Sequence, residues 1–154
     1  MKVASSHDVS ASQEAVFERI SDFDRFEAMI GSAGGQVARS DKGATPGVGS
    51  EWSGDVTFGG RSWTFNGVVE AFDPPSGYRT RGKSSGVVIE VEVACTASGP
   101  ERCQVTVTAQ LIAKSIAARL LLKPLQLAEG SITERFHRRV GAFLKEVEQE
   151  IATT

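Results

Sequence analysis

Few side chains in this sequence could perform acid–base or nucleophilic chemistry. It has two histidines, His7 and His137, two cysteines, Cys95 and Cys103, and a single tyrosine, Tyr78. His137 lies in "RFHRR", where a catalytic general base would need a neighbour to orient it, and the local sequence supplies none. We therefore interpret His137 as one member of a solvated, basic helix face.

The sequence also shows no cofactor or metal motif in the structural context that such a motif needs. So few histidines and cysteines, without zinc or redox spacing, do not predict a metal site. The stretch "GVGSEW" fails the dinucleotide-binding fingerprint because Trp52 stands where its third glycine belongs. The letters of a Walker-type loop occur at 77–84 and those of Gly-x-Ser-x-Gly at 82–86, but both coincide with the predicted strand at 78–83 and the turn before the next strand. A phosphate-binding loop and a nucleophile elbow each need a helix directly after the motif, so we infer neither. We expect no cofactor and no metal.

The two cysteines lie on either side of a predicted turn, "SGPE". A disulfide between Cys95 and Cys103 is geometrically allowed if the two flanking segments pair as strands. In a reducing cytosol, however, we expect buried free thiols.

Composition and charge narrow the class of protein. The chain has 154 residues, 40% of them hydrophobic, with 17 basic and 19 acidic side chains and a net charge of −2. A chain of this length can bury a sizeable core, and no block of like charge suggests binding to nucleic acid. No apolar run suits a signal peptide or a bilayer span. We expect one domain over residues 1–154 in a cytoplasmic protein without a transmembrane segment.

The first third of the chain predicts a strand followed by two short helices. The strand covers residues 2–9, and Ser10 and Gln13 have the spacing of a capping box. A second cap at Ser21 or Asp22 predicts a second helix. The apolar residues of these two helices are Val16, Phe17, Ile20, Phe23, Phe26, Met29 and Ile30.

The middle of the chain alternates apolar and polar residues, as half-buried strands do. The stretch from Gly31 to Ser53, rich in glycine, serine and proline, predicts loop and bending strand. Strands are expected at 51–58 and 61–72, joined by a turn at Gly59 and Gly60. The apolar positions of these two strands are Trp52, Val56, Phe58, Trp63, Phe65, Val69 and Ala71.

Three more strands follow the proline-containing break "DPPSG". They cover 78–83, 87–97 and 103–111, and the last two have the clearest alternation. Sheets of this pattern are antiparallel, with one buried and one solvated face. The apolar face of the last two strands comprises Val87, Ile89, Val91, Val93, Cys95, Ala97, Cys103, Val105, Val107, Ala109 and Leu111.

The end of the chain predicts a long amphipathic helix that covers this face. From Ser131 to Ile151 it would measure about 30 Å, and Pro124 and Gly130 predict a kink or break before it. Its apolar stripe comprises Ile132, Phe136, Val140, Phe143, Leu144, Val147 and Ile151.

This order of elements resembles the START-like superfamily, also called SRPBCC or the polyketide cyclase/dehydrase and lipid transport group. The resemblance covers roughly residues 2–151 and rests on "VSASQEAVFERISDFDRF", "PGVGSEW", "VVEAFDPPSGYRTRG" and the terminal helix. It implies an α+β helix-grip fold. In this fold a curved antiparallel sheet of six or seven strands wraps around a long C-terminal helix, and two short helices follow the first strand.

The resemblance also implies a deep apolar cavity between sheet and helix that holds a hydrophobic small molecule. Ordinary core packing is the alternative for each aromatic residue on that face. The candidate lining residues are Phe26, Met29, Trp52, Trp63, Phe65, Tyr78, Ile89, Leu111, Leu127 and Phe136.

The direction of one strand bears on the chemistry. If Tyr78 points inward, then Arg79, Arg81 and Lys83 point to solvent, because neighbouring strand residues alternate between faces. If the parity is inverted, an arginine in the pocket could bind a ligand carboxylate, which would favour an enzyme.

Three functions remain open. The leading hypothesis is a non-enzymatic carrier or sensor of a lipid, an isoprenoid or an aromatic metabolite. The alternative is an enzyme resembling polyketide cyclases and aromatases, in which a shaped pocket orients a reactive poly-β-ketone. The third is a partner-binding module related to chaperone activators. It predicts an exposed apolar patch at "IAARLLLKPLQLA". The ligand and the oligomeric state are left open.

Overall fold

The computed structural model of the chain describes residues 1–32, 34–41, 45–58 and 60–154. Within these residues lie seven strands and four helices. The sequence patterns assign residue ranges to six of these strands, and β2 is the additional one. The elements are β1 (Lys2–Val9), α1 (Gln13–Ile20), α2 (Phe23–Ser32), β2 (Gln36–Arg39), β3 (Glu51–Phe58), β4 (Arg61–Asp73), β5 (Gly77–Ser84), β6 (Val87–Gly99), β7 (Arg102–Ala113), α3 (Ile116–Leu127) and α4 (Glu129–Ala152).

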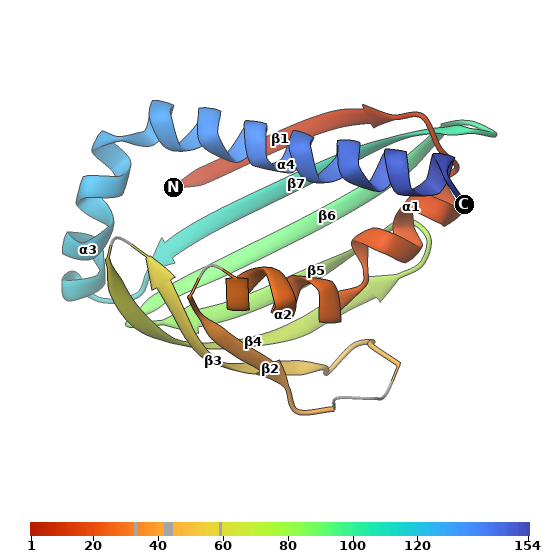
Figure 1. Cartoon of the computed structure of the whole chain (residues 1–154). Helices are drawn as coiled ribbons and strands as arrows, with labels where there is room; N and C mark the ends of the chain where they lie inside the picture. Colours follow the sequence, from red (N-terminus) through yellow and green to blue (C-terminus); the bar gives the residue numbers. More distant parts are fainter. Residues whose placement is uncertain (33, 42–44, 59) are drawn as a thin grey trace.

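The seven strands form one antiparallel sheet in the order β1-β7-β6-β5-β4-β3-β2. The first two strands of the sequence therefore form the two edges. Figure 1 shows the sheet curving around α4, which crosses its concave side. This arrangement is the predicted α+β helix-grip fold.

Helix α4 is the longest element, with 24 residues, or about 36 Å of helix. It begins at Glu129, two residues before the predicted start at Ser131. The predicted break upstream is confirmed at Ala128, where α3 ends. Pro124 lies inside α3, and Gly130 lies in the first turn of α4.

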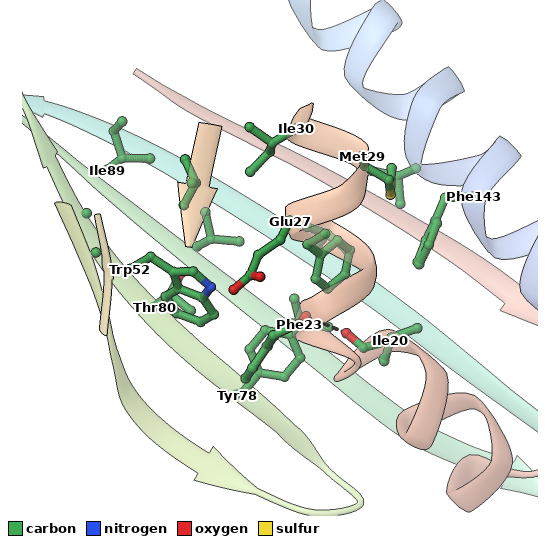
Figure 2. A pocket seen from close by; sticks show the side chains of 18 of the residues that line it. Ile20, Phe23, Glu27, Met29, Ile30, Trp52, Tyr78, Thr80, Ile89 and Phe143 are labelled. Atoms are coloured by element: carbon green, nitrogen blue, oxygen red, sulfur yellow. Dashed lines mark hydrogen bonds between the residues drawn. The ribbon is translucent and has the colours of Figure 1, made fainter. Parts of the chain in front are cut away.

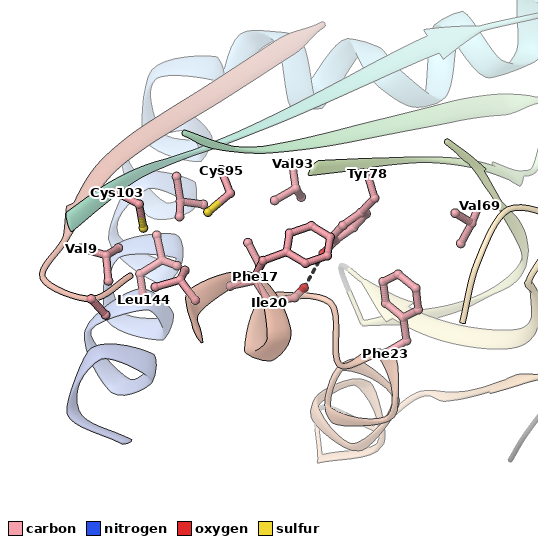
Figure 3. Packing of buried hydrophobic residues seen from close by; sticks show 13 residues of the cluster. Val9, Phe17, Ile20, Phe23, Val69, Tyr78, Val93, Cys95, Cys103 and Leu144 are labelled. Atoms are coloured by element: carbon pink, nitrogen blue, oxygen red, sulfur yellow. Dashed lines mark hydrogen bonds between the residues drawn. The ribbon is translucent and has the colours of Figure 1, made fainter. Parts of the chain in front are cut away.

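The core lies where α1, the start of α2 and the C-terminal half of α4 meet the sheet (Figure 3). Phe17 and Phe23 pack edge-on against Tyr78 of β5, with ring centroids 6.3 and 5.2 Å from its own. Leu144 and Val147 of α4 are buried. Because burial of one such side chain contributes about 1.5–3 kcal/mol, this end of α4 is held firmly on the sheet.

The start of α1 differs from the predicted capping box at Ser10. The N-cap is Ser12, whose hydroxyl accepts a backbone N–H from the first turn. The backbone N–H of Ser10 instead donates to Glu148 of α4 at 2.8 Å, and the Gln13 side chain donates to the Cys95 carbonyl at 2.8 Å. Tertiary partners therefore occupy the groups that a local capping box would have used.

A register shift in β4 corrects the predicted face of Ala71. The pairing of β4 with β5 is irregular between Val69 and Ala71, which is typical of a β-bulge. As a result Phe72, rather than Ala71, lies opposite Tyr78 and joins the core. One extra residue is enough to exchange the two faces of a strand.

The turns that flank β4 lie where the glycines and prolines predict them. Gly60 has a φ of +75°, which suits a tight hairpin turn. Gly59, the other residue of the predicted turn, lies outside the described residues. Between β4 and β5 the backbone N–H of Ser76 donates to the carbonyl of Asp73 at 2.7 Å, and Pro74 and Pro75 are joined by a cis peptide.

Strand β2 falls within the segment from Gly31 to Ser53, which the sequence predicts as loop and bending strand. It pairs with β3, and Val37 lies opposite Gly54. Gly54 has a φ of +151°, and a Cβ atom there would overlap the carbonyl group of Gln36. The absence of a side chain at Gly54 therefore allows β2 to approach β3.

We expect Gly54→Ala to lower the free energy of unfolding by more than about 1 kcal/mol, because the added methyl displaces the β2 backbone and alanine is strained at this φ. Urea denaturation followed by tryptophan fluorescence measures the change. The control is Gly130→Ala, whose Cβ would meet no atom within 4 Å and which favours helix. Equal stability of the two variants would contradict the close approach of β2 to β3.

Candidate functional site

A cavity of about 460 Å³ lies between the inner face of the sheet, helix α2 and helix α4 (Figure 2). Its wall is almost entirely apolar. The helices contribute Ile20, Phe23, Phe26, Glu27, Met29, Ile30, Phe136, Arg139, Val140, Phe143 and Leu144, and the strands contribute Val37, Trp52, Phe65, Gly67, Tyr78, Thr80, Arg81, Gly82, Ile89, Val91, Val93, Val105 and Val107.

Seven of the ten predicted lining residues lie in this wall. They come from α2, four different strands and α4, so the fold brings together residues that are far apart in the sequence. These seven are Phe26, Met29, Trp52, Phe65, Tyr78, Ile89 and Phe136.

The other three predicted lining residues, Trp63, Leu111 and Leu127, lie outside the cavity wall. Trp63 lies further towards the β3–β4 turn, and the guanidinium of Arg61 covers its ring at 4.8 Å from the centroid. Leu111 packs in a separate cluster beneath α3. Leu127 ends α3 and is 88% exposed. Sequence parity identifies the face of a strand but not the point along it where a cavity ends.

A pair of glycines makes room in the floor of the cavity. Gly67 of β4 lies opposite Gly82 of β5. A Cβ atom at Gly82 would lie 2.5 Å from the Phe65 ring, and one at Gly67 would lie 3.0 Å from it. The Phe65 ring therefore lies against bare backbone, which keeps it out of the space above.

Tyr78 points inward, but its hydroxyl is already bonded. It donates a hydrogen bond to the carbonyl of Ile20 at 2.7 Å, as the dashed line in Figure 2 marks. Burial raises the pKa of this hydroxyl far above its usual value. Tyr78 thus ties β5 to the end of α1 and is poorly suited to donate a proton to a ligand.

The inward direction of Tyr78 places the arginines of β5 on the outer face. The Arg81 guanidinium donates to Glu90 at 2.8 Å, and both Arg79 and Arg81 lie within 4 Å of Glu70. Lys83 shares their parity. The alternative in which one of these cations enters the cavity is therefore wrong.

Glu27 is the main polar group that the sequence interpretation missed. One of its carboxylate oxygens accepts the backbone N–H of Arg39 at 2.9 Å. Figure 2 shows the carboxylate directed towards Trp52 within the apolar wall. The sequence could have indicated this residue, because Glu27 lies four residues after Phe23 and three before Ile30. An acidic residue at that spacing lies on the apolar stripe of the helix.

An arginine ties α2 to α4 beside the cavity. The Arg25 guanidinium donates twice to the Glu150 carboxylate, both at 2.9 Å, and lies 3.2 Å from Glu146. It also covers the Phe143 ring at 4.9 Å. Its hydrogen bonds first, and its charge in addition, lower the pKa of the Glu150 carboxyl. The first half of α2 is thus held against α4, whereas Met29 in its second half is 47% exposed.

A second polar cluster lies between β1 and α4, outside the cavity wall. The Ser5 hydroxyl lies 2.6 Å from His7 Nε2 and 2.7 Å from His137 Nδ1. The two imidazole rings stack with centroids 4.4 Å apart, and Gly141 leaves room for the His7 ring. His137 is exposed, as the sequence predicts, but it also has an orienting neighbour, which the local sequence does not show. Ser5 is 132 positions away in sequence, so no local pattern could reveal it.

The cysteines offer no reactive nucleophile. Cys95 and Cys103 are free and buried. Burial, together with the neighbouring Cys103, raises the pKa of Cys95 to about 12.

Within the part of the chain that the structure describes, no group of three or more His, Cys, Asp or Glu residues is arranged to hold a metal ion. Among the described helices, none combines the length and the apolar character needed to cross a bilayer.

Comparison with known proteins places this geometry in a family. The sequence pattern of the family described as "Polyketide cyclase / dehydrase and lipid transport" matches residues 1–149. No curated protein matches the sequence significantly.

Solved structures share the fold at low sequence identity. The Zhui aromatase/cyclase from Streptomyces sp. R1128 is 18% identical with a TM-score of 0.69, over 98% of this chain and 95% of that one. Norcoclaurine synthase from Thalictrum flavum is 11% identical with a TM-score of 0.67, over 100% and 87%. A START superfamily protein from Mycobacterium smegmatis is 20% identical with a TM-score of 0.54, over 87% and 95%.

The serine–histidine cluster predicts a pH dependence of stability. Burial first, and then the neighbouring His137, lower the pKa of His7 below 6.5. Because the unfolded chain then binds a proton more readily than the folded protein, stability is complete above about pH 6.5 and falls as the pH drops through and below that value. We expect the melting temperature to fall between about pH 7 and pH 5.

The control for this prediction is His7→Gln, which can still bond to Ser5 but does not titrate. It should show a flatter profile over the same range. The stability that the Glu150 carboxylate contributes is lost only below pH 4.5, so its effect on the melting temperature separates from that of His7. An identical pH profile for the wild-type and His7→Gln proteins would contradict the role of His7.

Proposed function

Because the chain belongs to the polyketide cyclase/dehydrase and lipid transport family, we propose that its cavity binds a hydrophobic small molecule and carries or senses it without converting it. A lipid, an isoprenoid or an aromatic metabolite has the required apolar surface. The observation that carries the proposal is the cavity itself, which is enclosed by sheet, α2 and α4 and lined almost entirely by apolar side chains. Its volume of about 460 Å³ is in the usual range for small-molecule sites.

The chemistry of the wall favours binding over catalysis. General acid–base catalysis needs a titratable group within reach of the ligand and a second group that orients or completes it. The Tyr78 hydroxyl is engaged by Ile20, and the guanidinium groups of Arg79 and Arg81 pair with acids on the outer face. Arg81 also borders the cavity, but its guanidinium is bonded to Glu90. The other polar side chains in the wall are Glu27, Thr80 and Arg139.

The second half of α2 supports an entrance between α2 and α4. Met29 is exposed and also lines the cavity, and Arg139 of α4 is likewise exposed and lines it. A methionine adapts its shape at low cost, which suits a site through which apolar molecules pass. We therefore propose that the ligand enters beside Met29.

We expect protein purified gently from its own host to carry a stoichiometric hydrophobic adduct. Native mass spectrometry, followed by extraction, detects and identifies it. Val91→Trp should reduce the adduct at least about tenfold, because Val91 lines the cavity and the indole fills space that the ligand needs.

Trp63→Ala is the matched control, since Trp63 lies outside the cavity wall and should leave the adduct in place. Thermal melts of both variants establish that they are folded. If the wild-type protein is empty and takes up nothing from a mixture of lipids and metabolites, or if Trp63→Ala removes the adduct and Val91→Trp does not, the binding proposal is wrong.

A cyclase-like enzyme is the second candidate, and Glu27 is the observation that favours it. Its carboxylate, held by the Arg39 backbone N–H, lies in an apolar wall where it could remove a proton from a bound poly-β-ketone. If so, Glu27→Gln should slow the conversion of such a ketone by about 100-fold or more. The dissociation constant of the ketone, measured by tryptophan fluorescence, should be nearly the same for the wild-type protein and Glu27→Gln. Equal turnover by both proteins would remove Glu27 from catalysis.

A further inference from the structure

Helix α3 has two apolar faces, and only one of them is covered. Ala118 and Leu122 are buried against the sheet. On the opposite side Ile116, Leu120 and Leu127 are 78%, 64% and 88% exposed. Of the six large apolar side chains exposed among the described residues, four lie on this one helix. A contiguous patch of this kind usually marks an interaction site.

The exposed residues form one stripe along the helix. Ile116, Leu120 and Leu127 are separated by four and seven residues, and such positions fall on one side of an α-helix. Pro124 is exposed on the same side. The stripe cannot fold back on the sheet, because the opposite side of α3 already packs there.

Charge indicates what the stripe contacts. Lys114, Arg119 and Lys123 are exposed around it, and no acidic residue occurs from 114 to 127. The whole chain, in contrast, has a net charge of −2. An apolar stripe flanked only by cations is complementary to a surface that is apolar inside and anionic outside, which describes a membrane that contains acidic lipids.

The size of the stripe argues against a second copy of the chain as the partner. A helix of 12 residues is about 18 Å long and roughly 10 Å wide. One face therefore offers on the order of 200 Å², whereas a stable dimer buries about 800 Å² on each partner. A lipid surface needs no matching area, because each apolar side chain inserts independently.

We propose that α3 docks the protein on the surface of a membrane that contains anionic lipids. Ile116, Leu120 and Leu127 enter the boundary between head groups and acyl chains, and Arg119 and Lys123 pair with lipid phosphates and carboxylates. Figure 1 places α3 at the end of the molecule opposite the C-terminus. Ile89 packs in the cluster beneath α3 and also lines the cavity, so docking brings that end of the cavity to the membrane. This proposal goes beyond ligand binding and does not depend on what the cavity holds.

Sedimentation with vesicles tests the docking. We expect the full chain to bind vesicles of equal parts phosphatidylcholine and phosphatidylserine, and to bind phosphatidylcholine alone much more weakly. Leu120→Glu should weaken binding to the mixed vesicles at least about tenfold. Lys123→Glu should weaken it roughly twentyfold, since losing one positive charge near an anionic surface costs about fivefold and adding a negative charge costs about fivefold again.

Two matched controls change the same chemistry elsewhere. Val48→Glu alters an apolar side chain that is 68% exposed in the loop between β2 and β3. In Figure 1 the strand β2, which precedes this loop, lies far from α3. Lys145→Glu reverses an exposed charge on α4. Both should change binding by less than about threefold, because distant charges are screened.

Three results would overturn the proposal. The first is absence of binding to mixed vesicles, or equal binding by Leu120→Glu. The second is a lipid-free dimer that Leu120→Glu dissociates in sedimentation velocity, since the stripe would then face a second copy. The third is loss of vesicle binding in Val91→Trp, which fills the cavity and leaves α3 intact. That loss would mean that the signal came from lipid uptake, whereas intact binding by Val91→Trp keeps docking separate from ligand binding.

Discussion

The structure depends on how α4 packs on the concave face of the sheet. Its C-terminal half packs closely against the sheet, whereas its N-terminal half does not. Leu144 and Val147 are buried, and they stand next to the core that α1 and the start of α2 complete. Towards its N-terminus the helix leaves the sheet partly uncovered, and Phe136 and Val140 line a cavity instead. The closely packed half stabilises the fold, so the other half can leave space for a ligand.

The sequence alone predicts the elements well, because they depend on local periodicity. Alternation in the strands and the three- and four-residue spacing in α4 predict one antiparallel sheet covered by one helix. The predictions fail where a distant contact or a single residue decides. The bulge near Val69 exchanges the faces of Ala71 and Phe72, and the contact of Ser5 with His137 joins the two ends of the chain.

For the site, the sequence predicts which strand residues face inward but not where along each strand the cavity ends. Parity along the strands identifies residues that face inward, and Trp52, Phe65 and Tyr78 do line the cavity. Trp63 shares the parity of Phe65 but lies beyond the end of the cavity, because helix placement sets the boundary. Glu27 was missed because apolar residues alone were used to outline the site, although an acid on an apolar stripe is an informative exception.

The ties on α2 differ between its two halves. Its first half is anchored twice, by Phe23 in the core and by Arg25 on Glu150. Further along, Glu27 ties the helix to the edge strand β2 by accepting the backbone N–H of Arg39, and Met29 is exposed. The wall of the cavity that α2 forms is therefore supported by α4 on one side and by the edge of the sheet on the other. A change that displaces β2 from β3 would also displace this wall.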